Sequence, residues 1–247
     1  MKPRSWYVAG CCAIRLERWE DACTCFRRST NLDDNPEAWN NLATALLQIN
    51  KDVEAKHALS IAIKESSKWK VWMNYMYVCV LLNDLQDAIL AGIKVFSFIS
   101  PKWQQPIEEP DFNIYHQLIL KTIEEIKRNK NTFLEVRIFE LVELMVNKSP
   151  SYHSWTVASK LYIAAKDYSK AFLMIECAYR HLKDDYKVYY DEKKFNQLCE
   201  LGVELIRIAD LDKNEELQKR GRMVGTAIVD NAKLDTSDLE HLKEELK

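Results

Sequence analysis

The sequence predicts an all-α solenoid, in which consecutive helix pairs stack on one another and further helices cap the C-terminal end. Two observations predict this class. The 247 residues include only 5 Gly and 6 Pro, while 47% are apolar and 29% are charged, and such a composition favours helices. In addition, Trp6, Trp39 and Trp72 recur at equal intervals along the chain, which is typical of a repeat protein.

A small residue follows each tryptophan at a fixed distance. Ala22, Ala55 and Ala88 come at the same offset from Trp6, Trp39 and Trp72, and Trp155 precedes Ala171 by that offset too. Apolar residues at i, i+3, i+4 and i+7 from each Trp lie on one helix face, and each Ala begins a similar stripe on a second helix. Small residues let two antiparallel helices approach closely, so we expect these positions to be structural.

The same signals divide the chain into segments. We expect three contiguous helix pairs over 3–100, a Pro-rich linker over 101–110, a degenerate helix pair over 111–149, a fourth repeat over 150–185, and C-terminal helices over 186–247. The degenerate pair lacks the Trp–Ala register, and its helices are expected over 111–128 and 132–147. A short last helix is expected to begin at Ser237, with Glu240 completing a capping box.

This pattern resembles the tetratricopeptide repeat over residues 3–100 and 152–185. Two stretches, "SWYVAGCCAIRLERWEDACTCFRRSTNLDDNPEAWNNLATAL" and "KWKVWMNYMYVCVLLNDLQDAI", together with the helical tail, are similar to the C-terminal part of the tetratricopeptide repeat protein 27 family. The resemblance implies a right-handed superhelix with a concave groove. It also implies an intracellular, non-enzymatic protein linked to chaperone-assisted assembly of large complexes.

The beginning of the chain adds an expectation about its extent. The first repeat starts almost immediately after Met1, so nothing in this sequence covers the outer face of its first helix. Solenoids normally place a polar capping unit there. We therefore expect the chain to be the C-terminal part of a longer protein, or a short isoform of one.

Composition and charge narrow the range of partners and cellular compartments to be expected. The net charge of −2 gives no electrostatic case for a nucleic-acid or anionic-membrane surface. No apolar run approaches the roughly 18 residues of a membrane span, and the N-terminus lacks the apolar core of a signal peptide. Seven Cys, an odd number inside helical patterns, suit a reducing compartment. We expect a cytoplasmic protein, with the nucleus as a second compartment open to it.

Catalytic and metal chemistry find little support in the residues. Cys11, Cys12, Cys23 and Cys25 form the densest cluster, but the single residue between Cys23 and Cys25 is not the spacing of zinc motifs, so buried structural cysteines are expected. The five His are scattered, and there is no Gly-rich phosphate loop. The sequence predicts no catalytic residue, no metal ligand and no cofactor.

The concave groove is where such repeats usually bind partners. Some tetratricopeptide domains hold a C-terminal carboxylate with five polar residues, and Asn41 and Lys70 match that pattern. Tyr7 and Cys11 stand where the pattern needs Lys and Asn, and Asn74 stands where it needs a basic residue. We therefore expect Asn41, Lys70 and Asn74 to line a groove and hydrogen-bond an extended peptide of a protein partner, rather than to form this carboxylate clamp.

Other interpretations stay open. The phrase "KWKVWMNYMYV" also resembles half-a-TPR repeats of RNA-processing scaffolds. Trp39 and Trp72 are in register with the other repeat tryptophans and are expected in the core, while the off-register Trp69 is expected to be exposed. Lys219, Arg220 and Arg222 could contact an acidic partner or form an ordinary charged helix face. The favoured function is a protein–protein scaffold or adaptor, of the assembly-factor or co-chaperone-like kind, without membrane contact. An RNA-processing scaffold and a cysteine-based metal or redox protein are the alternatives.

Overall fold

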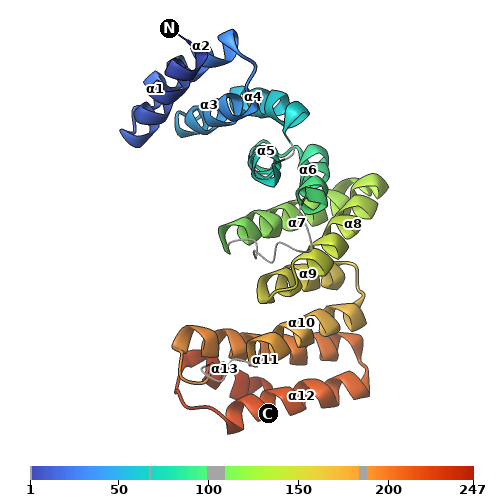
Figure 1. The fold of residues 1–247 in the computed structure, drawn as a ribbon. Helices are drawn as coiled ribbons and strands as arrows, with labels where there is room; N and C mark the ends of the chain where they lie inside the picture. Colours follow the sequence, from blue (N-terminus) through green and yellow to red (C-terminus); the bar gives the residue numbers. More distant parts are fainter. Residues whose placement is uncertain (1, 67, 99–108, 184–187) are drawn as a thin grey trace. The chain divides into compact units, whose positions relative to one another are not determined.

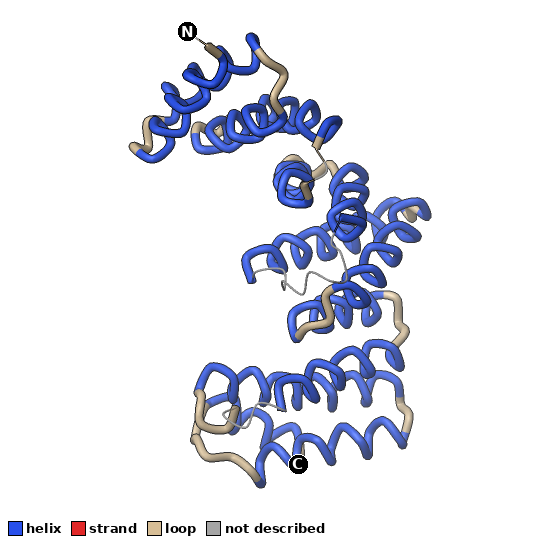
Figure 2. Tube along the Cα trace, viewed as in Figure 1, coloured by secondary structure: helices blue, strands red, loops and turns tan. Residues whose placement is uncertain are grey.

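The computed structural model describes residues 2–66, 68–98, 109–183 and 188–247, and this part of the chain contains thirteen helices and no strand (Figure 2). The all-α class predicted from the repeats is confirmed. Two compact units divide the chain: residues 1–104 with 124–144, and residues 105–123 with 145–247. Consecutive helix pairs within each unit stack as in an α-solenoid (Figure 1).

Three helix pairs make up most of the first unit. They are α1 (Pro3–Arg15) with α2 (Trp19–Leu32), α3 (Pro36–Gln48) with α4 (Asp52–Glu65), and α5 (Trp69–Leu81) with α6 (Leu85–Phe98). The second helix of each pair also packs on the first helix of the next, α2 on α3 and α4 on α5. Each pair thus buries an apolar face that it could not cover alone.

The degenerate pair consists of α7 (Glu109–Asn129) and α8 (Thr132–Lys148), which contribute to both units. Helix α7 begins slightly before the expected position 111, inside the segment predicted as a linker. Pro110 permits this start, because a proline in the first turn lacks only an N–H that has no partner within the helix. The rest of the predicted linker, residues 101–108, lies outside the described residues.

The fourth pair and the cap form most of the second unit. They are α9 (Tyr152–Ala164), α10 (Tyr168–Lys183), α11 (Glu192–Asp212), α12 (Glu215–Asp230) and α13 (Ser237–Glu245). The last helix begins at Ser237 as expected, but the capping box predicted there is wrong. The N-cap is Thr236, whose hydroxyl accepts from the Leu239 amide at 3.3 Å, while Glu240 pairs with Lys243 at 2.5 Å.

The alanines and tryptophans of the repeat occupy different environments. Ala22, Ala55, Ala88 and Ala171 are each 0% exposed. The four tryptophans are only half-buried, which differs from the core position expected for Trp39 and Trp72. Each lies near the start of its helix, and the ring edges of Trp39 and Trp72 reach polar groups. The Trp39 indole donates to Asp34 at 2.5 Å, and that of Trp72 donates to the Ser66 carbonyl at 3.2 Å.

The turn inside each pair has the same backbone geometry. At a fixed offset after each Trp comes a non-glycine residue with positive φ, and these are Glu17 (56°), Asn50 (57°), Asn83 (58°) and Lys166 (61°). The amide of the following residue donates back to a carbonyl in the last turn of the first helix, as from Lys51 to Leu46 at 3.0 Å. This Schellman arrangement ends the first helix. The repeat therefore fixes the turn as well as the helix faces.

A substitution at Asn50 tests this geometry. Replacing Asn50 by Val is expected to lower the free energy of unfolding by about 1–2 kcal/mol, because a β-branched side chain clashes in the left-handed region. Asn50→Gly should be nearly neutral, since glycine adopts positive φ without strain. Urea denaturation measures both, with the helical substitution Gln48→Val as the control. Equal losses for Asn50→Val and Gln48→Val would show that the turn conformation does not matter.

Candidate partner-binding surface

The first helices of the three N-terminal pairs share one row of partly exposed side chains. Cys11, Thr44 and Tyr77 occupy equivalent positions of the three repeats, as Asn41 and Asn74 do in the second and third. We call the following set the first-helix surface: Tyr7 and Cys11 on α1, Asn40, Asn41 and Thr44 on α3, and Lys70, Asn74 and Tyr77 on α5. Lys70, Asn74 and Tyr77 follow one another at i, i+4 and i+7, so they lie on one face of α5.

Hydrogen bonds connect this row from one repeat to the next. The Asn41 amide donates to the Tyr7 hydroxyl at 3.2 Å, and the Asn74 amide donates to Asn40 Oδ1 at 2.8 Å. A longer bond of 3.4 Å runs from Asn40 to Asn41 Oδ1. Both Asn41 and Asn74 thus reach a side chain on the first helix of the preceding pair. This polar ladder helps to fix how neighbouring first helices are aligned.

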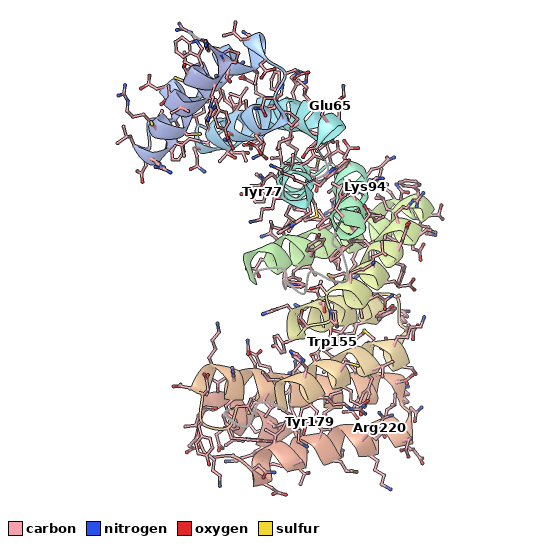
Figure 3. The ribbon with its side chains drawn as sticks, viewed as in Figure 1. Glu65, Tyr77, Lys94, Trp155, Tyr179 and Arg220 are labelled. Carbon is pink, nitrogen blue, oxygen red and sulfur yellow. The ribbon has the colours of Figure 1, made fainter. Side chains whose placement is uncertain are left out.

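The structure places the three predicted groove residues on this same surface but gives them different surroundings. Asn41 and Asn74 each use one amide hydrogen in the ladder, which leaves further donor and acceptor capacity. Lys70 is exposed, with its ammonium 5.5 Å from the centre of the half-buried Trp69 ring. Tyr77 is 38% exposed, and Figure 3 marks it on α5. The surface combines amide groups, one cation and two aromatic rings, those of Tyr7 and Tyr77.

Sequence reasoning missed Asn40, Thr44 and Tyr77. The equal spacing of Cys11, Thr44 and Tyr77 was a usable signal for two of them. Asn40 carried no such signal, because Tyr7 and Met73 take its place in the neighbouring repeats.

Tyr7 gives this end of the surface an aromatic rather than a cationic character. Its ring packs edge-on against Phe26 at 5.9 Å. Burial, followed by the influence of Cys11 and Glu37, raises the pKa of Tyr7, so the phenol stays neutral and can donate a hydrogen bond. A carboxylate clamp needs two cations close together, and among these residues only Lys70 carries a positive charge.

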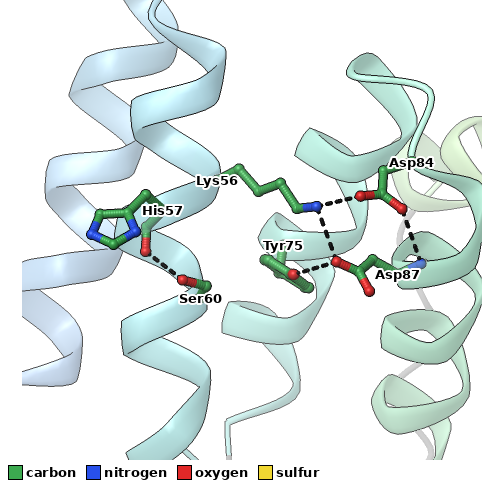
Figure 4. A network of polar contacts seen from close by, with 6 residues as sticks. All are labelled: Lys56, His57, Ser60, Tyr75, Asp84 and Asp87. Atoms are coloured by element: carbon green, nitrogen blue, oxygen red, sulfur yellow. Dashed lines mark hydrogen bonds and ion pairs between the residues drawn. The ribbon is translucent and has the colours of Figure 1, made fainter.

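A second polar network joins the second and third pairs (Figure 4). The Lys56 ammonium of α4 bonds to Asp84 and lies 3.0 Å from Asp87, which also accepts from the Tyr75 hydroxyl at 2.9 Å. Burial alone would lower the pKa of Lys56, but the bonds to the two carboxylates outweigh it and raise that pKa. Burial would raise the pKa of Asp87, and its bonds to Lys56 and Tyr75 reverse this.

Removal of the Lys56 ammonium should change how the free energy of unfolding depends on pH. Lys56→Met is expected to lower the free energy of unfolding at pH 7 by about 1 kcal/mol, because two half-buried carboxylates lose a charged donor. The folded-state pKa of Asp87 lies below its unfolded value, so its contribution is present above about pH 4 and is lost as the pH falls further. Urea titrations at pH 7 and pH 3 should show the difference from wild type shrinking at pH 3. An equal difference in unfolding free energy at pH 7 and pH 3 would show that the bonds of Lys56 to Asp84 and Asp87 do not stabilise the fold.

The cysteine cluster has structural thiols only in part, because Cys12 is exposed and Cys11 and Cys25 are half-buried, which differs from the buried positions expected. All seven cysteines are free, and Cys23 is buried. Burial raises the pKa of both Cys23 and Cys25, whereas a reactive cysteine needs a lowered pKa. In the described part of the chain, no group of three or more His, Cys, Asp or Glu side chains lies close enough together to hold a metal ion.

A hollow of about 340 Å³ lies between α2, α3 and α4. Trp39, Leu42, Leu46, Val53, His57 and Ala58 line it, and the ion pair of Arg27 with Glu54 lies at its side. Leu42 and Leu46 are almost fully buried. The hollow is therefore part of the packing between the first and second pairs and is separate from the first-helix surface.

The basic residues of α12 are largely engaged within the second unit. Arg220 bonds to Glu176 of α10 at 2.6 Å, and Arg222 donates to the Leu246 carbonyl at 3.1 Å. Lys219 is exposed. These contacts favour a structural role for the group over a binding site for an acidic partner.

Among the described residues, no helix has both the length and the apolar character that a membrane span requires. No protein-family model matches the chain. A TPR repeat-containing protein of Schizosaccharomyces pombe is 23% identical over 207 residues, which are 82% of this chain and 25% of that protein. The essential for maintenance of the cell wall protein 1 of Saccharomyces cerevisiae is 24% identical over 211 residues, covering 82% of this chain and 23% of that protein.

A shorter match is closer in sequence. Tetratricopeptide repeat-containing protein trd-1 of Caenorhabditis elegans is 35% identical over 89 residues, which are 35% of this chain and 12% of that protein. The chain thus spans about a quarter or less of the length of these relatives. PilF of Pseudomonas aeruginosa aligns over 98% of this chain and 97% of that chain, with a TM-score of 0.48 and 11% identity. The Trp–Ala register, the helix pairs and the relatives' names support the tetratricopeptide repeat superfamily.

Proposed function

We propose that this chain is a non-enzymatic scaffold of the assembly-factor or co-chaperone-like kind, whose first-helix surface binds an extended segment of a protein partner. The observation that carries the proposal is the row of Tyr7, Asn41 and Asn74 across three repeats, with Lys70 and Tyr77 beside it. Amide side chains at regular intervals can satisfy the backbone N–H and C=O groups of an extended peptide.

The cation and the aromatic ring suggest which segment fits. Lys70 favours a partner side chain or terminus with a negative charge, and Tyr77 offers an apolar ring with a polar tip. We further propose kinship with the tetratricopeptide repeat protein 27 family, and a place in the cytoplasm or nucleus. Seven cysteines without a disulfide among them suit the reducing environment of these compartments, which supports this placement.

The test uses variants that leave the ladder intact. Lys70→Glu with Tyr77→Ala changes two exposed side chains of α5, and Lys94→Glu with Leu90→Ala makes comparable changes on α6. The control is matched, because Tyr77 is 38% exposed and Leu90 is 37% exposed. Partners captured by the wild-type chain are purified, and their affinities for the three proteins are measured after circular dichroism shows equal folding.

We expect the α5 variant to bind its partner at least tenfold more weakly and the α6 variant to bind like wild type. Equal binding by all three proteins would exclude the first-helix surface. RNA bound with an affinity that falls steeply with salt would favour the RNA-processing alternative.

A further inference from the structure

One face of α1 is exposed where the same face of α3 and α5 is buried. Ser5 and Cys12 are exposed. Their counterparts in the second and third repeats are Ala38 (0% exposed), Val71 (5%), Ala45 (0%) and Val78 (0%). The difference has a simple source within the first unit, because α2 packs on α3 and α4 packs on α5. The exposed face of α1 corresponds to the face that receives a second helix in the other two pairs.

Two apolar side chains next to this face are also exposed. Val8 is 52% exposed and Leu16 is 67% exposed. Val8 takes the position of Asn41 and Asn74, whose amides reach back to the preceding pair. In the same register Val8 corresponds to a contact with the first helix of the preceding pair, because Asn41 reaches Tyr7 on α1 and Asn74 reaches Asn40 on α3. The contact at Val8 would be apolar instead of a hydrogen bond.

Charges repeat in the same register. Asp21, Glu54 and Asp87 occupy equivalent positions of the three repeats. Glu54 receives Arg27 from α2, and Asp87 receives Lys56 from α4 at 3.0 Å. In both cases a cation on the second helix of one pair meets the acid of the next pair.

Asp21 instead pairs with Arg18 of its own turn at 2.5 Å, and the two side chains are 52% and 66% exposed. Lys51 and Glu54 form the equivalent local pair at 3.4 Å, yet Glu54 still accepts Arg27. Asp21 can therefore keep Arg18 and accept a second cation.

We propose that the exposed face of α1 seats the second helix of a further tetratricopeptide-type pair, stacked ahead of α1 in the register of the other repeats. The seated helix carries small and apolar residues toward Ser5 and Cys12 and an Arg or Lys toward Asp21, while the first helix of the same pair places an apolar residue against Val8. The contacts of α2 with α3 and of α4 with α5 provide two internal templates for this interface.

A fusion tests the proposal directly. A copy of residues 36–68 is joined to Pro3, so that Lys68 of the copy replaces Lys2 and the repeat register is kept. The copy contains no cysteine. It carries Ser60→Arg, which in this register faces Asp21 as Arg27 faces Glu54. The matched control carries Ser60→Glu in the copy. Alkylation of Cys12 is followed by mass spectrometry in a Cys11→Ser background, with the half-buried Cys177 of α10 as the internal reference.

In the Ser60→Arg fusion we expect Cys12 to react at least tenfold more slowly than in the unfused chain, while the reactivity of Cys177 is unchanged. The Ser60→Glu fusion should recover several-fold of the lost reactivity, because two acidic groups then face each other. Unchanged Cys12 reactivity, or a fusion that melts at a lower temperature than the unfused chain, overturns the proposal. So does sedimentation of the unfused chain as a dimer with Cys12 protected, because a second copy would then be the occupant.

Discussion

Ala55→Phe is expected to destabilise the chain by about 3 kcal/mol, at the upper end of the range for overpacked cores. Ala55 is 0% exposed, as are Ala22, Ala88 and Ala171 at the same repeat position. A phenyl ring cannot be accommodated there unless α3 and α4 move apart, and such a movement would also disturb the contacts that α4 makes with α5. The measurement is the free energy of unfolding by urea.

Lys64→Phe is the control for that substitution, because Lys64 is exposed in the last turn of the same helix. A surface substitution of this kind should change stability by no more than about 0.5 kcal/mol. If Ala55→Phe proved as mild as Lys64→Phe, close helix approach at the repeat alanine would not be what organises the pair.

Arg220→Met is expected to destabilise the chain by about 2 kcal/mol, somewhat less than the usual effect of breaking a buried ion pair. The Glu176 side chain is only 10% exposed and lies between Arg220 at 2.6 Å and Arg180 at 3.1 Å. Removing one partner of a buried ion pair leaves a poorly compensated charge, which typically costs about 3–5 kcal/mol. We expect less here because the Arg220 side chain is 39% exposed. Thermal or urea unfolding measures the loss.

Two further variants separate the buried charge from simple loss of packing. Arg180→Met should cost less than about 1 kcal/mol, because the Arg180 side chain is 67% exposed and surface ion pairs contribute little. Glu176→Met combined with Arg220→Met should recover most of the stability, because no buried charge remains. A double variant as unstable as Arg220→Met alone would assign the effect to the contact of Arg220 with the Phe172 ring.

The fold could be predicted from the sequence because the repeat multiplies a weak local signal. One Trp–Ala pair would mean little, but four pairs with the same spacing identify the helix pairs and the buried alanines. The half-buried position of Trp39 and Trp72 could not be predicted in the same way. Hydrophobic spacing reports which face a residue occupies, whereas exposure near a helix start depends on local partners such as Asp34.

The hydrogen bonds of the polar ladder could not be predicted from the sequence. The residue type of Asn41 matches a known binding pattern, and Asn74 occupies a position of that pattern that needs a basic residue. Their bonds to Tyr7 and Asn40, however, depend on how neighbouring pairs are aligned. That alignment is set by packing between helices far apart in the chain. The face of α1 is a similar case, since Cys12 differs from Ala45 and Val78 in exposure only because of what packs against each helix.

The most direct test of the central claim is a photocrosslinking comparison within the third pair. A photoreactive phenylalanine analogue replaces Tyr77 on α5 in one protein and Leu90 on α6 in another, since these side chains are 38% and 37% exposed. Each protein is irradiated with the purified partner. Binding at the first-helix surface predicts a partner adduct from position 77 and none from position 90. An adduct from position 90 alone would contradict it and would assign the contact to the second helices.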